Sequence, residues 1–260
     1  MDTAFYHKQL IEAAKEGDAQ KVQEVLTIVC DPRANSEALF QAAQNGHGRC
    51  VEIVLPQSKE QSENMRALIA AAKNGHAQCV EQLIACSGFF KKDNCALPLA
   101  ATNGHTDVVR MLMKVCSKQT VDDALMAAVS NGNHECAKEL IVKASRNTKN
   151  EALIKAAHCG YASCVEVLIP VSNTKAKDSQ ALRFAVLGQH TQCIDILLDV
   201  SDSSKVLAEL QRVFYHKPEV WELFAQQMES RNQRAILTKA IALRRDCVKN
   251  TDMKTPAKKV

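Results

Sequence analysis

Histidine and cysteine recur in this chain at a spacing that could bind a metal ion. In three places a His is followed three residues later by a Cys, and both side chains are common zinc ligands. The pairs are His47 with Cys50, His76 with Cys79, and His190 with Cys193. In another copy of the same phrase Val108 takes the place of the Cys, and the surrounding pattern does not change. We therefore expect each Cys to be a buried packing group, and we expect no metal site.

The sequence gives little support to a catalytic role. His158 and Cys159 could form a nucleophile pair, but they are adjacent and no third residue stands out as an orienting group. The chain has no phosphate-binding loop, dinucleotide fingerprint, zinc-protease phrase or nucleophile elbow. We expect no catalytic residue, no cofactor and no small-molecule substrate, so the chain is predicted not to be an enzyme.

The His and Cys positions belong to a phrase that occurs seven times: a Leu, a pair of small residues three positions later, a turn residue, and an apolar helix pattern. The turn residues are Gly17, Gly46, Gly75, Gly104, Gly132, Gly160 and Gln189, which lie 28 or 29 residues apart. A period of this length indicates a solenoid of stacked units, in which each unit contacts its neighbours.

One unit shows what each copy should form. Residues 37–45 place Leu39, Ala42 and Ala43 on one face of a short helix, and Gly46 ends that helix. Residues 47–55 carry a second apolar stripe that includes Cys50. Each repeat is therefore predicted to be a helix, a tight turn and a second helix. Its paired small residues should allow neighbouring backbones to approach closely.

This pattern resembles the ankyrin repeat. The Gly-His turn and the helix after it recur at Gly46-His47, Gly75-His76 and Gly104-His105, and the similarity covers roughly residues 5–200. The resemblance implies an all-α, ankyrin-like solenoid of about seven helix-turn-helix repeats that binds other proteins. It also implies that the turn His hydrogen-bonds nearby backbone across the loop.

The repeats also depart from the ankyrin pattern. Alanine occupies the position of the family's Pro, as at Ala38 and Ala67, and the period is shorter than the usual ~33 residues. We infer that the β-hairpin between repeats is reduced to a loop, for instance over residues 57–63. The groove should then be shallow and lined by first helices and loop tips.

Partner-binding residues are expected where polar or aromatic side chains stand just before the turns or in the loops. The predicted set is Gln41, Gln44, Lys73, Thr102, Lys155, Phe184, Leu187, Phe89, Phe90, Lys91 and Lys92. Two alternatives stay open. Phe184 and Leu187 are either an apolar anchor for a partner or a contact for a cap on the last repeat. Phe89 and Phe90 are either both exposed anchors for a partner, or one of them fills the gap left by the missing hairpin.

The C-terminal part differs in charge from the rest. Residues 205–260 hold 12 Lys and Arg against 6 Asp and Glu. We expect the solenoid over 1–200, a helical C-terminal cap over 201–247 and a disordered basic tail over 248–260. The leading hypothesis for function is a non-catalytic scaffold or adaptor. Alternatives are a binder of nucleic acid or anionic lipid through the basic region, and a regulatory subunit of an enzyme.

The cysteines and the N-terminus suggest a compartment. The count of 11 Cys is odd, and the chain starts without an apolar leader or a membrane-length stretch. We expect a monomer in the reducing cytoplasm. The hairpin-poor repeats are also compatible with an effector that an intracellular pathogen delivers into host cytosol.

Overall fold

The computed structural model describes residues 3–28, 31–58, 61–86, 95–172 and 174–200. Throughout these residues every regular element is helical. The chain divides into two compact units, Met1–Lys149 and Asn150–Val260. The expected C-terminal cap and basic tail lie outside the described residues.

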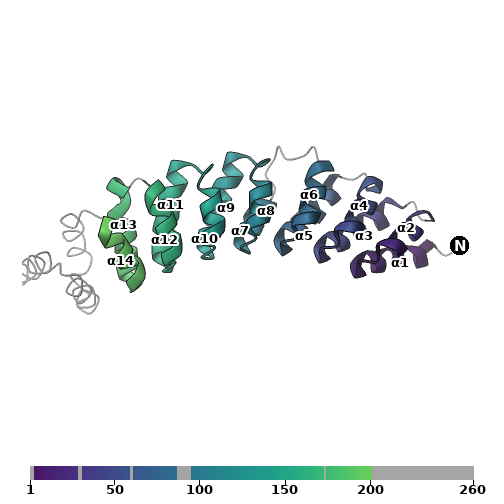
Figure 1. Ribbon diagram of the computed structural model, residues 1–260, viewed down its shortest axis with the longest axis horizontal. Helices are drawn as coiled ribbons and strands as arrows, with labels where there is room; N and C mark the ends of the chain where they lie inside the picture. The colour runs from purple at the N-terminus through teal and green to yellow at the C-terminus, as the bar shows by residue number, and fades with distance from the viewer. Residues whose placement is uncertain (1–2, 29–30, 59–60, 87–94, 173, 201–260) are drawn as a thin grey trace, which may run out of the picture. The chain divides into compact units, whose positions relative to one another are not determined.

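The helices come in pairs, and the first and second members of each pair alternate along the chain (Figure 1). The first helices are α1 (Thr3–Glu16), α3 (Pro32–Asn45), α5 (Gln61–Asn74), α7 (Ala96–Thr102), α9 (Lys118–Ser130), α11 (Arg146–Cys159) and α13 (Thr174–Leu187). The second helices are α2 (Ala19–Leu26), α4 (Gly48–Val54), α6 (Ala77–Cys86), α8 (Thr106–Leu112), α10 (His134–Leu140), α12 (Ala162–Leu168) and α14 (Thr191–Val200). Short 3-10 turns, η1 (Leu55–Gln57) and η2 (Ile169–Val171), follow α4 and α12. In the unit of residues 1–149, α1, α3, α5, α7 and α9 pack successively on one another. The predicted helix-turn-helix solenoid is confirmed.

The first helices begin earlier than the sequence pattern predicted. We expected a loop over 57–63, but α5 already starts at Gln61, and α3 starts at Pro32 instead of residue 37. Most of the chain that would form a hairpin has become the first turns of these helices. Side-chain caps set several of the starts: Asp31 accepts a hydrogen bond from the Arg33 amide, and Ser117 accepts one from the Thr120 amide.

A residue with a positive φ follows each first helix within two positions. The six turn glycines have φ values between 74° and 84°. After Gly46 the His47 amide donates to the Ala42 carbonyl at 2.9 Å, which closes the last turn of α3. In the seventh repeat the same position is Gln189, with φ 57°. Among the described residues it is the one non-glycine residue in this conformation.

Replacing Gln189 with Gly should therefore stabilise the chain. A left-handed residue with a side chain costs about 1–2 kcal/mol. The greater conformational freedom of glycine in the unfolded chain offsets part of the gain from removing that cost. We expect the free energy of unfolding to rise by about 0.5–1 kcal/mol, measured by urea denaturation. Gln192→Gly, in the helix that follows, is the control and should be destabilising. A loss of stability in Gln189→Gly would show that the Gln side chain makes a contact of its own.

The core of each repeat follows the pattern read from the sequence. Each first helix buries one Leu at the same position. Among these leucines, Leu39, Leu68, Leu97 and Leu125 are each less than 2% exposed. The paired small residues are buried in every repeat, as at Ala71. Burying one such Leu contributes about 1.5–3 kcal/mol. The small pairs contribute instead by letting adjacent first helices approach.

Candidate functional site

Four turn histidines each join their repeat to the one before it. The Nε2 atom of His47 donates to the Lys15 carbonyl at 2.9 Å, His76 to Gln44 at 3.0 Å, His105 to Lys73 at 2.9 Å, and His190 to His158 at 3.0 Å. Asn133 takes the same place in the fifth repeat and donates to the carbonyls of Ala101 and Thr102 at 2.8 and 2.7 Å. We call these bonds the turn ladder. The expected bond from His to backbone is present, but its acceptor belongs to the preceding repeat and not to the same loop.

The turn ladder also explains why the turn residue of the preceding repeat is a glycine. A Cβ atom on Gly75 would lie 2.5 Å from Nδ1 of His105, and one on Gly46 would lie 2.6 Å from Nδ1 of His76. The imidazole ring therefore packs directly on the glycine backbone of the previous turn. The fit is looser where Asn133 replaces the histidine, because a Cβ atom on Gly104 would lie 3.2 Å from Asn133.

The same geometry separates the two members of each His-x-x-Cys pair. His47 points to the carbonyl of Lys15, whereas Cys50 is fully buried inside the repeat. Within the described part of the chain no group of three His, Cys, Asp or Glu side chains is placed to hold a metal ion. The two residue types therefore have separate structural roles.

Burial controls the chemistry of the cysteines that lie in the apolar stripes of the second helices. It raises the pKa of Cys79, Cys164 and Cys193 to about 11, and it also raises the pKa of Cys50 and Cys136. At Cys79 the neighbouring Cys50 thiol adds a smaller upward shift of the pKa. Because the thiolate is the nucleophile, these side chains are protonated and unreactive near neutral pH. By contrast, Cys95 is exposed.

We expect alkylation to reveal this difference. In native protein at about pH 8, a thiol of pKa about 11 is thiolate about one part in a thousand, and burial blocks the reagent as well. Iodoacetamide should therefore modify Cys95 first and leave Cys50, Cys79, Cys136 and Cys164 unmodified until denaturant is added. Peptide mass spectrometry gives the order. Equal rates at Cys79 and Cys95 in folded protein, or stoichiometric zinc that is lost in Cys50→Ala, would contradict the packing role.

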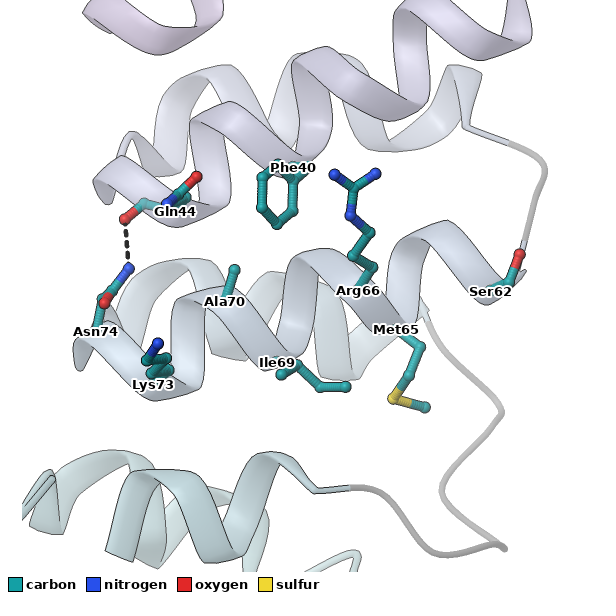
Figure 2. Close-up of a pocket in the computed structure, with 9 residues that line it drawn as sticks. All are labelled: Phe40, Gln44, Ser62, Met65, Arg66, Ile69, Ala70, Lys73 and Asn74. Atoms are coloured by element: carbon teal, nitrogen blue, oxygen red, sulfur yellow. Dashed lines mark hydrogen bonds between the residues drawn. The ribbon is translucent and has the colours of Figure 1, made fainter. Parts of the chain in front are cut away.

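A hollow of about 400 Å³ opens on the first helices α3 and α5 (Figure 2). Its lining residues are Phe40, Gln44, Ser62, Met65, Arg66, Ile69, Ala70, Lys73 and Asn74. In Figure 2 the methyl group of Ala70 points toward the Phe40 ring, and Ile69 and Met65 lie on the other side of α5. The small side chain of Ala70 is what leaves the space open.

One end of the hollow is fixed by a charged cluster. The Arg66 guanidinium lies over the Phe40 ring, 4.0 Å from its centroid, and pairs with Glu37 at 3.3 Å and with Glu63 at 3.2 Å. Gln41 donates to the second oxygen of Glu37 at 2.9 Å. Ion pairs this exposed contribute little stability, about 0–1 kcal/mol. Their effect is to hold Arg66 and Phe40 in place as one wall.

The structure brings some of the predicted binding residues together. Gln44 and Lys73 both line the hollow, and Gln41 supports its wall through Glu37. On α7 the Thr102 hydroxyl donates to the Pro98 carbonyl of its own helix. The predicted loop residues Phe89, Phe90, Lys91 and Lys92 lie outside the described residues.

The remaining predicted residues lie in the unit of residues 150–260. The Phe184 ring meets His158 edge to face at 5.4 Å, and the Arg183 guanidinium lies 5.3 Å from its centroid. Leu187 is 37% exposed, and Lys155 is half-buried on α11. Phe184 is half-buried, so it is already partly covered by its own neighbours.

Sequence reasoning missed the apolar half of the hollow. Phe40, Met65, Ile69 and Ala70 were not among the predicted residues. A signal was present, since Phe40, Ile69 and Pro98 recur at the repeat spacing of 29 residues, and Phe40 directly precedes the predicted Gln41. Their apolar character made them resemble core, but all three are only half-buried.

Comparisons with known proteins agree with this architecture. A family model described as ankyrin repeats, in three copies, matches residues 10–94, 39–123, 88–149 and 125–208. The chain therefore belongs to the ankyrin-repeat family, as the sequence pattern indicated. Among the 66 chains of solved structures that match is the crystal structure of the human ASB11 ankyrin repeat domain. Its TM-score is 0.57 at 20% identity, and the match covers 68% of this chain and 90% of that one. No curated protein matches the sequence significantly.

Membership of this family has a general consequence for function. Ankyrin repeats are protein–protein interaction modules. Among the described residues no helix combines the length and apolar character needed to cross a membrane.

Proposed function

We propose that this protein is a non-catalytic adaptor that binds another protein on the first-helix surface of residues 1–149. The observation that carries the proposal is the hollow, where apolar side chains are left half-exposed between polar rims. A partner's anchor residue gains most of its binding energy where it fills a pocket and is desolvated there. The first helices are also the elements that successive repeats hold in fixed register, so the surface is formed before the partner arrives.

The charged cluster supports a role in recognition. Arg66, Glu37 and Phe40 hold one another in place, although exposed pairs of this type add little to stability. A fixed wall costs the complex less conformational entropy on binding than a mobile one does. The cluster is therefore suited to orienting a partner.

Filling the hollow should abolish binding without unfolding the protein. Ala70→Arg places a long charged side chain in the hollow, and Ala85→Arg makes the same change at an exposed residue of α6 in the same repeat. Each variant and the unmodified protein would be used to capture proteins from a eukaryotic cytosol extract, and captured proteins would be quantified by mass spectrometry. We expect at least one protein that binds the unmodified chain and Ala85→Arg equally and binds Ala70→Arg about tenfold less, a loss of about 1.4 kcal/mol.

The test requires that both variants fold. Their melting temperatures should stay close to that of the unmodified protein. The affinity for the captured protein, once purified, would then be measured by calorimetry. If every captured protein binds Ala70→Arg as well as it binds Ala85→Arg, the hollow is not the binding site and the proposal fails.

A further inference from the structure

Four asparagines form a regular row at the ends of the first helices. They are Asn45, Asn74, Asn103 and Asn131, spaced 29, 29 and 28 residues apart, and all are exposed. Each uses its Nδ2 atom to donate to a main-chain carbonyl: Asn45 to Gln41, Asn74 to Gln44, Asn103 to Leu99 and Asn131 to Ala127, at 2.8 to 2.9 Å. We call these four residues the asparagine row.

The bonds of the asparagine row fix which amide atom is left over. With Nδ2 turned to the backbone, each Oδ1 is an acceptor for which no donor is found among the described residues. Asn74 also lines the hollow, so at this repeat the acceptor lies at the edge of the candidate binding site (Figure 2). The row thus offers one hydrogen-bond acceptor per repeat across four repeats.

Apolar side chains run parallel to the asparagine row. Phe40, Ile69, Pro98 and Met126 occupy equivalent positions on α3, α5, α7 and α9, and all four are half-buried. We call them the apolar band. Core residues of the same helices are almost completely buried, as at Leu68. The band is therefore apolar surface that this part of the chain leaves partly open.

We propose that the apolar band and the asparagine row bind one extended, polyproline II-like segment of the partner, with an apolar residue at every third position. Packed helices lie about 8–10 Å apart, which sets the distance between equivalent residues of adjacent repeats. A polyproline II helix advances about 9 Å in each turn of three residues, and its amides carry no internal hydrogen bonds. One turn of the segment therefore spans one repeat, places one side chain on the band and brings one N–H group to each asparagine. This inference rests on the proposed function and names the class of partner segment.

The charges around the hollow add one requirement to the segment. The nine lining residues include Arg66 and Lys73 and no carboxylate. Arg66 is already paired with Glu37 and Glu63. Lys73 is exposed, and it has no acidic partner in the part of the chain that the structure describes. The segment carries an acidic residue beside the apolar side chain that enters the hollow.

A helical partner segment satisfies these features less well. An α-helix uses its own carbonyls to satisfy its amides, so it has no N–H groups to offer to the asparagine row except in its first turn. It would cover the same acceptors and leave them without donors, which is unfavourable for a buried acceptor. The row therefore favours a partner whose main chain is extended.

A displayed peptide library tests the inference directly. A library of random peptides of about sixteen residues, long enough for about five turns of polyproline II, would be selected on the full chain and counter-selected on Ala70→Trp, in which the hollow is filled. We expect enriched peptides with apolar residues at every third position, often Pro, and an acidic residue at a fixed place among them. Enrichment of apolar residues at three-, four- and seven-residue spacing, typical of a helix, would overturn the inference, and so would no enrichment above background.

The charge requirement is tested on one recovered peptide by fluorescence anisotropy. Ala70→Trp should weaken binding at least tenfold, and Ala85→Trp should change it less than about twofold. Lys73→Glu should weaken binding about fivefold, and a peptide with Lys in place of its acidic residue should restore that loss. Absence of that rescue would remove the acidic requirement.

The two proposals can fail separately. If a helical peptide binds and Ala70→Trp blocks it, the hollow is a protein-binding site but the extended segment is wrong. If the captured cytosolic proteins also bind Ala70→Arg as well as they bind Ala85→Arg, the proposed function fails too.

Discussion

Replacing Gly75 with Ala is expected to lower the free energy of unfolding by about 3 kcal/mol. Gly75 has φ +79°, and a side chain in this left-handed conformation costs about 1–2 kcal/mol. In addition, the new Cβ atom would lie 2.5 Å from Nδ1 of His105. The ring must move, and its hydrogen bond to the Lys73 carbonyl, worth about 1 kcal/mol, is then lost. Urea denaturation followed by circular dichroism measures the change.

The chain supplies a matched control for this prediction. Gly104 has nearly the same φ, +78°, but the atom nearest to its added Cβ would be Asn133 Oδ1 at 3.2 Å. Gly104→Ala should therefore show the backbone cost and little more, about 1–2 kcal/mol. His105→Asn in the Gly75→Ala background copies this natural arrangement and should recover part of the loss. If Gly75→Ala and Gly104→Ala are equally destabilising, the imidazole contact has no energetic role.

Replacing Ala71 with Leu is expected to cost about 3 kcal/mol, the upper part of the usual range for overpacking. Ala71 is fully buried, where successive first helices pack on one another. Three further carbon atoms at this position push the helices apart and disturb both neighbouring repeats. Thermal melting should show a large fall in midpoint. A melting temperature within a few degrees of the unmodified protein would mean that the close approach is not needed.

Ala72→Val is the control for the small pair. Valine already occupies this position in other repeats, as Val129 and Val186, and both are buried there. We therefore expect Ala72→Val to cost less than about 1 kcal/mol. The pair of variants tests whether the first small residue is the stricter one.

The sequence predicted those features that recur in every repeat. Gly46 and its equivalents mark the turns, because a positive φ strongly selects glycine. Leu68 and the leucines at the same position of the other first helices mark the core, because burial selects one large side chain per helix. Cysteine was correctly assigned to the core because Val108 replaces it in one repeat. Repetition turns each of these weak single-residue signals into a reliable one.

Features that depend on a single repeat were not predictable in the same way. The hollow depends on the particular side chains that α3 and α5 carry, including Phe40, Arg66 and the small Ala70. Sequence spacing cannot show that Arg66 lies over Phe40, because that contact joins two repeats through side-chain conformation. The early starts of the first helices were missed for another reason. Their capping residues, such as Ser117 and Ser145, were not used as helix-start signals, although each accepts a hydrogen bond from the amide three positions later.

The turn ladder has a consequence for how such a chain changes in length over evolution. Residues 47–75 contain one His that donates to the preceding turn, and one Lys73 carbonyl and one Gly75 that receive the His of the following turn. Duplication of this stretch of the gene copies a donor together with an acceptor. The inserted copy would meet a matching surface on both sides, and loss of one copy would leave no mismatched turn. Unequal recombination between copies can therefore lengthen or shorten the solenoid, and with it the span of partner that it contacts, without compensating mutations at the junctions.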